Sequence, residues 1–206
     1  MCYFVSSKLT NNDIKKVFNA EYESPDYKGS TFINGFAFPQ LLVITDENPD
    51  IAVLGDWGLV PPWSRDENIR KMTLNARAET ITEKPAFKAS VSQRCLILVN
   101  GFYEWKWLDP AGKKKQRYYI EFNNGHQPFA IAGIYNRWHN HETGQDLLSF
   151  SLLTTKANEL MAEIHNTKHR MPLVLGPSVH KSWLAGKSEE LFTFPHYNTE
   201  LIATEA

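Results

Sequence analysis

The sequence has few cysteines, no excess of charge of either sign and no long hydrophobic run. Two cysteines, Cys2 and Cys95, cannot make a disulfide framework, and no CxxC or Cys/His spacing indicates a zinc site. The 22 Lys and Arg residues nearly balance the 23 Asp and Glu residues, so any nucleic acid would need a local basic patch. No run approaches the ~18 apolar residues of a membrane span, and residues 1–13 are too polar for a signal peptide. We expect a soluble cytoplasmic protein without a membrane partner.

The residues that are present can form one well-packed domain over 1–206. A hydrophobic content of 42% and an aromatic content of 13% suffice for a sizeable core. Residues 19–35 are rich in polar residues, Gly and Pro and predict a surface loop, while residues 72–80 lack strand alternation. Strands are expected over residues 2–6, 36–45, 51–60, 95–99, 118–122, 129–135, 147–154 and 171–175, and helices over 10–18, 85–90, 158–163 and 178–184. Because the order lacks regular βα alternation, we predict an α+β fold dominated by strands, a curved antiparallel sheet or partial β-barrel with peripheral helices.

Cys2 directly follows Met1, and removal of Met1 would leave a free α-amine beside the thiol. Reference pKa values of about 7.7–8.0 for the amine and about 8.5 for the thiol keep part of each group reactive near neutral pH. The pair suits an aldehyde, because the amine forms an imine and the thiol then closes a five-membered thiazolidine ring. Such a cysteine can also be an acyl-transfer nucleophile with its own amine as base. A cysteine at this position without any function is the remaining alternative.

Two further polar residues could take part in such chemistry. Glu104 stands among Phe102, Tyr103 and Trp105, where apolar surroundings would raise its pKa and suit it to general acid/base catalysis. Alternatively it faces water from a strand whose aromatic residues alternate inward, which the local pattern alone favours. Asn75 can donate and accept hydrogen bonds at once and could hold a reacting amine, although asparagine is also a common turn residue.

The segment from Ile164 to Pro172 brings His165, His169 and two cations together between a predicted helix and a predicted strand. Histidines in such loops are usually solvated or structural. The three lysines at positions 113–115 predict a solvated turn. Neither segment alone identifies a function.

The order and spacing of five short motifs resemble those of one family. The motifs are Met1-Cys2, Trp57-Gly58-Leu59-Val60-Pro61, Leu74-Asn75-Ala76-Arg77-Ala78-Glu79-Thr80, Gly101-Phe102-Tyr103-Glu104-Trp105, and Ile164-His165 with Arg170-Met171-Pro172. Over essentially its whole length the chain resembles the SRAP (SOS response-associated peptidase) family, whose members shield abasic sites in single-stranded DNA by crosslinking to them. The resemblance implies one SRAP-like domain that needs neither a metal nor another cofactor.

The resemblance also implies roles for four catalytic residues. Cys2, after Met1 removal, would form a thiazolidine with the aldehyde of the abasic deoxyribose. Asn75 would position the amine, Glu104 would transfer protons, and His165 would help to open the sugar and reverse the crosslink. The family's Ile-His-x-Arg-Met-Pro is stretched here by three residues, so His169 is the alternative to His165.

DNA-binding residues follow from the same resemblance. Arg77 and Arg170 match cations that contact phosphates, and Thr154 matches a hydroxyl that contacts the backbone. Trp63 and Pro39 match the apolar wedge that stacks on bases and keeps the substrate single-stranded. In many members Gly-Arg follows the cysteine, whereas Tyr3-Phe4 follows it here, so one phosphate contact is missing.

The resemblance leaves two other functions open. In a cysteine peptidase acting on its own Met1 or on peptides, Cys2 would be the nucleophile and His165 the base. This ranks second, because a peptidase nucleophile can stand anywhere in a chain, whereas an aminothiol must stand at its start. A plain single-stranded DNA binder would have equal affinity for intact and abasic strands. We expect a monomer that binds single-stranded DNA containing abasic sites, associated with the nucleoid if the source is bacterial.

Overall fold

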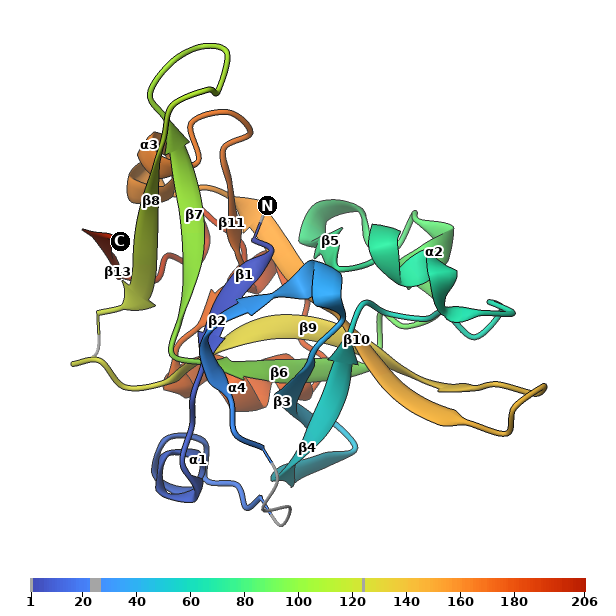
Figure 1. Cartoon of the computed structure of the whole chain (residues 1–206). Helices are drawn as coiled ribbons and strands as arrows, with labels where there is room; N and C mark the ends of the chain where they lie inside the picture. Colours follow the sequence, from blue (N-terminus) through green and yellow to red (C-terminus); the bar gives the residue numbers. More distant parts are fainter. Residues whose placement is uncertain (1, 23–26, 124) are drawn as a thin grey trace.

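The first of two β-sheets has five antiparallel strands in the order β13-β8-β7-β1-β2 (Figure 1). The computed structural model describes residues 2–22, 27–123 and 125–206. The strands are β1 (Phe4–Ser7), β2 (Ser30–Asn34), β7 (Gly101–Trp107), β8 (Lys115–Phe122) and β13 (Leu201–Glu205). The β7–β8 hairpin projects from one end of the molecule, and β1, which follows Cys2, lies between β2 and β7.

The second sheet contains a cycle of paired strands. Its members are β3 (Gln40–Thr45), β4 (Asn48–Trp57), β5 (Asn75–Arg77), β6 (Arg94–Val99), β9 (Phe129–His139), β10 (Asp146–Lys156), β11 (Arg170–Pro172) and β12 (Val174–Leu175). Pairing runs from β10 through β4, β3, β6 and β9 and back to β10, which gives a partial five-stranded barrel. The prediction of a strand-dominated α+β fold with a partial barrel is confirmed.

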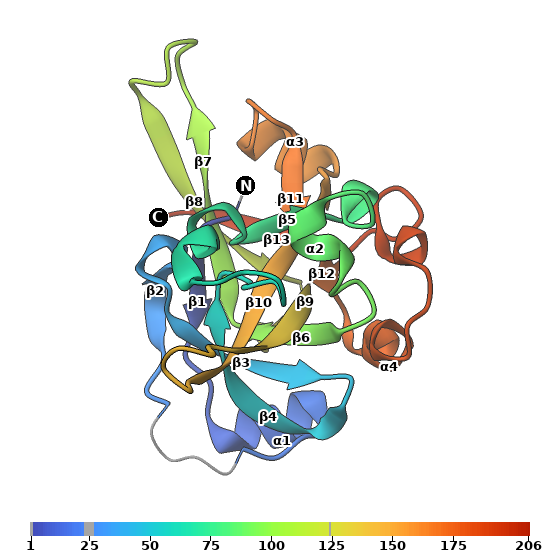
Figure 2. The same ribbon diagram turned by 90° about the vertical axis from the view of Figure 1, so that its right-hand side faces the viewer.

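Short helices lie around the sheets. The α-helices are α1 (Asn11–Phe18), α2 (Pro85–Lys88), α3 (Glu159–Ile164) and α4 (His180–Leu184), and 3-10 turns cover Gly35–Ala37, Glu67–Met72, Ala78–Thr80, Pro177–Val179 and Glu189–Phe192. The predicted start of α1 is confirmed, since Thr10 and Asp13 form a capping box there. In Figure 2, α3 and the β7–β8 hairpin lie at one end of the molecule and α1 at the other. In the described part of the chain no helix is long and apolar enough to cross a membrane.

The barrel strands carry apolar side chains on both faces. Along β3, Leu41 and Val43 pack into one buried cluster, while Leu42 and Ile44 pack into a second. Successive side chains of a strand point to opposite faces, so β3 separates the two clusters. Full burial of such a side chain contributes about 1.5–3 kcal/mol. The barrel is therefore a rigid support for the segments that carry the site.

Several elements differ from the sequence-based expectation. The predicted strand over 36–45 begins only at Gln40, because Gly35–Ala37 form a 3-10 turn, and three strands form with unexpected partners. Within the predicted loop over 19–35, β2 pairs with β1, and residues 23–26 of that loop lie outside the described residues. Residues 75–77 form a strand despite lacking alternation, because they pair in parallel with β10. Near the end of the chain, β13 pairs with β8 although no strand was predicted there. In each case the partner is distant in sequence, so local pattern could not define the strand.

Candidate functional site

Cys2 is buried, with 1% of its surface exposed, at the entrance to β1. Its carbonyl oxygen accepts a hydrogen bond of 2.9 Å from Asn75 Nδ2, and its Sγ donates to the carbonyl oxygen of Phe4 at 3.5 Å. Met1 itself lies outside the described residues. Two independent contacts thus fix the position of Cys2.

Asn75 reaches Cys2 from the first position of β5. In the parallel pairing with β10, Asn75 is in register with Leu152, and the buried Ala76 is in register with Leu153. The Oδ1 atom of Asn75 is buried and accepts no hydrogen bond from the described residues. An unused acceptor therefore lies on the side chain that already holds Cys2.

Glu104 lies on β7, the neighbour of β1, with only 6% of its surface exposed. It shares the inward side of β7 with Phe102, while Tyr103 and Trp105 are partly exposed. The alternative in which Glu104 faces water is therefore wrong. Its Oε1 accepts a hydrogen bond from the Trp105 backbone N–H at 3.4 Å, and burial raises the pKa of its carboxyl group. Glu104 thus holds a proton at higher pH than an ordinary glutamate.

His165 follows α3 and is also buried. Its Nδ1 lies 2.8 Å from the carbonyl oxygen of Arg170 and 3.2 Å from the backbone nitrogen of the same residue. Burial above all, followed by the positive charge of the N-terminus, lowers the pKa of His165 to about 4. The ring is therefore neutral at physiological pH. His169 is exposed and lies 3.2 Å from the carbonyl oxygen of Ala162 through Nδ1, so of these two histidines only His165 lines a pocket with Glu104.

An open pocket of about 360 Å³ joins Glu104 and His165. Tyr3 lines it next to the buried Cys2, so the predicted catalytic residues converge at one place. Burial, followed by the charge of Glu104, raises the pKa of the Cys2 thiol well above its ordinary value. The thiol thus stays protonated at neutral pH, and an α-amine at this position would be the first nucleophile.

The predicted DNA-binding residues fall into exposed and buried groups. Arg77 is exposed on β5, and the side chain of Trp63 is also exposed, with its Nε1 donating to Pro85 at 3.2 Å. Pro39, just before β3, is half-buried. Exposed Arg and Trp side chains are the types that contact phosphates and bases.

Arg170 and Thr154 are buried next to β5. The guanidinium of Arg170 donates to both carboxylate oxygens of Glu79, at 2.8 and 2.9 Å, and to the carbonyl oxygen of Thr154 at 2.7 Å. Thr154 is in register with Arg77 and donates to the carbonyl oxygen of Ala76 at 3.2 Å. The structure thus brings Arg77, Thr154 and Arg170 together, but only Arg77 offers its cation to solvent.

Several pocket residues had no signal in the sequence. Phe4, Trp107, Lys115 and Lys168 line the pocket from four separate segments. Lys115 was expected in a solvated turn, yet it begins β8. In the sequence, only the departure from the family pattern at Tyr3-Phe4 had drawn attention to this side of the pocket.

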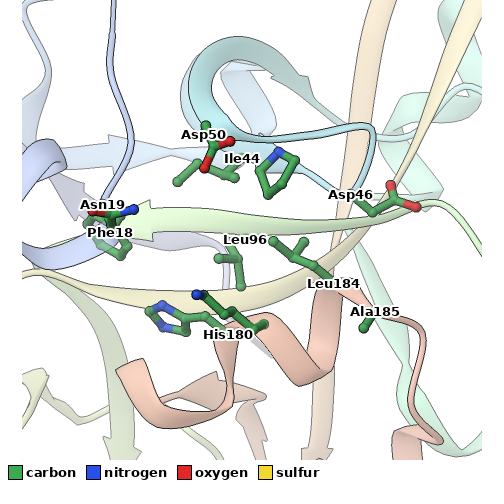
Figure 3. Close-up of a pocket in the computed structure, with 11 residues that line it drawn as sticks. Phe18, Asn19, Ile44, Asp46, Asp50, Leu96, His180, Leu184 and Ala185 are labelled. Carbon is green, nitrogen blue, oxygen red and sulfur yellow. The ribbon is translucent and has the colours of Figure 1, made fainter.

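A second pocket, of about 410 Å³, is lined by residues of α1, β3, β4, β6 and α4 (Figure 3). Phe18, Leu96 and Leu184 give it an apolar lining, while Asp50 and His180 lie around it. None of the predicted catalytic residues reaches it. We place the candidate site at Cys2, because the reactive groups converge there. In the described part of the chain no cluster of three or more His, Cys, Asp or Glu residues is arranged to hold a metal ion.

Comparisons with known proteins agree with the sequence motifs. The abasic site processing protein YoqW of Bacillus subtilis (strain 168) is 39% identical over 194 residues, which cover 93% of this chain and 81% of that protein. The abasic site processing protein HMCES of Xenopus tropicalis is 33% identical over 150 residues, covering 62% of this chain and 43% of that protein. A crystal structure of a protein from Bacteroides thetaiotaomicron matches with a TM-score of 0.86 and 32% identity, over 98% of this chain and 91% of that one. The family model described as SOS response associated peptidase (SRAP) matches residues 1–203, and the chain therefore belongs to this family.

Proposed function

We propose that this protein processes abasic sites in single-stranded DNA by forming a covalent thiazolidine between Cys2, after Met1 removal, and the abasic deoxyribose. The observation that carries the proposal is the convergence of Cys2, Asn75 and Glu104, with His165 on the same pocket. The names of the relatives YoqW and HMCES support the substrate class.

The crosslink forms in two bond-making steps. The α-amine of Cys2 first attacks C1′ of the ring-opened sugar, and the carbinolamine loses its oxygen as water to give an imine. The thiol then adds to the imine carbon while its proton passes to the nitrogen, so that C1′ ends bonded to both N and S. The raised pKa of the thiol supports this order, because a protonated thiol is a poor first nucleophile.

Burial gives the other residues complementary roles in these steps. Glu104, whose pKa is raised, can donate a proton to the departing hydroxyl group, which leaves as water, and regain it from the nitrogen as the imine forms. It can then relay the thiol proton to the imine nitrogen as the ring closes. Neutral His165 can accept the proton of the C1′ hydroxyl of the closed sugar. The C1′ carbonyl then forms as the C1′–O4′ bond breaks, and O4′ takes up a proton from solvent, so that the ring opens. Asn75 Oδ1 can accept a hydrogen bond from the amine and hold it near C1′.

DNA would approach along β5 and the Trp63 segment. Arg77 would bind a phosphate, while Trp63 and Pro39 would stack against bases. The contacts predicted for Arg170 and Thr154 would require these side chains to exchange part of their internal hydrogen bonds for phosphate oxygens. Arg77 is accordingly the first cation to test.

A peptidase that cleaves its own Met1–Cys2 bond is the second candidate function. In this reaction Cys2 Sγ would attack the Met1 carbonyl carbon and displace its own α-amine, and water would then hydrolyse the thioester. The neutral His165 favours it, since a free imidazole can act as base. The raised pKa of the thiol disfavours it as the main activity. Intact-mass measurement of wild type and His165→Gln would show whether Met1 loss depends on His165.

The experiment for the main proposal is a denaturing gel of purified, Met1-processed protein mixed with single-stranded DNA that contains one abasic site. We expect a slowly migrating band with abasic DNA and none with intact DNA. Cys2→Ala and a variant that retains Met1 should abolish the band, while the matched control Cys95→Ala, at the other buried cysteine, should keep it. Equal binding of intact and abasic strands without any band would refute the crosslink and leave a plain DNA binder.

A further inference from the structure

The pocket next to Glu104 and His165 has a second wall that the proposed chemistry does not use. We call it the hairpin pocket and define its outer wall by Phe4, Trp105, Trp107, Lys115 and Lys168. It lies between the β7–β8 hairpin and the loop after α3. Its volume of about 360 Å³ is within the range of small-molecule and nucleotide sites.

Hydrogen bonds between the side chain of Asn166 and the backbone of Trp107 hold the loop after α3 against the hairpin. Asn166 Nδ2 donates to the carbonyl oxygen of Trp107 at 2.9 Å, and the Trp107 N–H donates to Asn166 Oδ1 at 3.1 Å. An ion pair of 2.5 Å between Lys106 and Glu163 joins β7 to α3 itself. Because the Asn166 side-chain amide bonds both the N–H and the carbonyl oxygen of Trp107, it fixes the position of its loop on the hairpin. Lys168, two residues further along this loop, is thereby positioned relative to Trp107.

The outer wall combines aromatic rings with cations. Phe4 and Trp105 meet edge to face with ring centroids 4.9 Å apart, and both are partly exposed. Lys115 Nζ lies 5.1 Å from the centre of the Trp107 ring, and Lys168 is exposed on the facing loop. Aromatic surfaces stack on bases and lysines bind phosphates, so this wall suits a nucleotide better than an uncharged apolar ligand.

The location of the pocket relative to Cys2 also suits a DNA strand. Asn75 of β5, the strand that also carries Arg77, contacts Cys2 at the entrance to β1, and β1 pairs directly with β7, on which the hairpin pocket is built. A strand bound to both would therefore pass over Cys2. Its abasic sugar would lie at Glu104 and His165, with the next nucleotide in the pocket.

We propose that the hairpin pocket binds the nucleotide adjacent to the abasic deoxyribose, with its base against Trp107 and Trp105 and its phosphate between Lys115 and Lys168. This inference rests on the proposed function, because the abasic sugar is what the neighbouring residues hold. Binding of this nucleotide would make the rate of crosslinking depend on the base at one side of the lesion.

The test uses abasic oligonucleotides in which the flanking nucleotide on either the 5′ or the 3′ side is replaced by a base-free tetrahydrofuran spacer. For wild type we expect one of the two spacers to slow crosslinking about tenfold, in line with the stacking of one base. Trp107→Ala should slow crosslinking of the abasic strand that lacks a flanking spacer by a similar factor. The crosslinking rate of this variant should not change further when the spacer is introduced. Trp107→Phe should restore part of the rate, and Leu108→Ala, at the exposed next residue, should behave as wild type.

The cations are tested with Lys115→Gln and Lys168→Gln against Lys113→Gln, a nearby exposed lysine outside the pocket. Each of the first two should weaken binding of a non-reactive strand that carries a tetrahydrofuran at the lesion, measured by fluorescence anisotropy, and Lys113→Gln should not. If wild type crosslinks with equal rates on all strands and the Trp107 and lysine variants match it, the pocket proposal is overturned while the proposed function stands. If wild type forms no crosslink, the proposed function fails, and the anisotropy arm still decides whether the pocket binds a nucleotide.

Discussion

Burial, more than charge pairing, sets the protonation states at the site. It raises the pKa of the Glu104 carboxyl and lowers that of the His165 imidazole, so each shift favours the neutral form. Glu104 therefore keeps its proton to a higher pH than an ordinary glutamate, while His165 stays unprotonated to a lower pH than an ordinary histidine. This combination allows protons to move in both directions as an imine forms and closes.

Replacement of Glu104 by Gln tests the proton-transfer role directly. Gln keeps the shape and can accept the backbone hydrogen bond of Trp105, but it cannot exchange a proton at neutral pH. We expect the initial rate of crosslinking to fall by about 10²–10⁴, the usual size of general acid/base catalysis, with unchanged binding of intact single-stranded DNA. Rates come from timed denaturing gels and binding from anisotropy. A fall of less than about threefold would remove Glu104 from the proton-transfer steps.

His165 should make the protein sensitive to acid. Its pKa is about 4 in the folded protein against an ordinary 6.5, so between these values the unfolded chain binds more protons. Stability from this residue is complete above about pH 6.5 and is lost as the pH falls toward 4, by at most about 3 kcal/mol. Urea titrations of wild type and His165→Gln at several pH values measure the effect.

The expected result is a steeper loss of stability in the wild type than in His165→Gln across this window. The exposed His141→Gln serves as the control and should follow wild type. Parallel curves for wild type and His165→Gln would mean that His165 takes up its proton in the folded state as readily as in the unfolded chain.

At the scale of elements, the sequence predicted those strands that are buried on both faces. β3, β6 and β9 each contain a continuous apolar run, because both faces of these strands pack into a buried cluster. β2 is a mostly exposed edge strand and β5 has three residues, so neither has a readable pattern. These two strands exist because β1 and β10 offer them hydrogen-bonding partners.

The candidate site likewise has features that the sequence predicted and features that it did not. Family membership followed from five motifs and is confirmed by the family model. The inward orientation of Glu104 could not be read locally, because aromatic residues occupy both faces of β7. The hairpin pocket was missed since its residues come from β1, β7, β8 and the loop after α3, which only the folded chain brings together.

DNA binding can be tested at β5, because the exposed Arg77 on this strand and the buried Arg170 nearby can be substituted one at a time. Arg77→Gln removes an exposed cation that the structure does not use internally as far as the described residues show, so we expect little change in the melting temperature. Affinity for single-stranded DNA should fall, and the slope of log affinity against log salt should decrease in magnitude by about 0.7, the value for one phosphate contact.

Arg170→Gln provides the contrast on the neighbouring strand. It leaves Glu79 without its bidentate partner and should lower the melting temperature, in addition to any change in DNA binding. Unchanged affinity and salt slope for Arg77→Gln would show that the phosphate lies elsewhere.

For the whole molecule, the near-neutral charge limits how DNA can be bound. A net charge of −1 offers no general attraction to a polyanion, so affinity must come from the few cations beside Cys2 and from stacking. Arg77 on one side and Lys115 with Lys168 on the other would bind about two phosphates. For single strands this corresponds to a slope of log affinity against log salt of about −1.4. Anisotropy titrations of a single-stranded oligonucleotide between about 50 and 300 mM salt would measure this slope.

A slope steeper than about −4 would require a larger basic surface than these residues form. A slope near zero would mean that stacking alone holds the strand, and it would remove both the Arg77 contact and the two lysines of the hairpin pocket from the binding site.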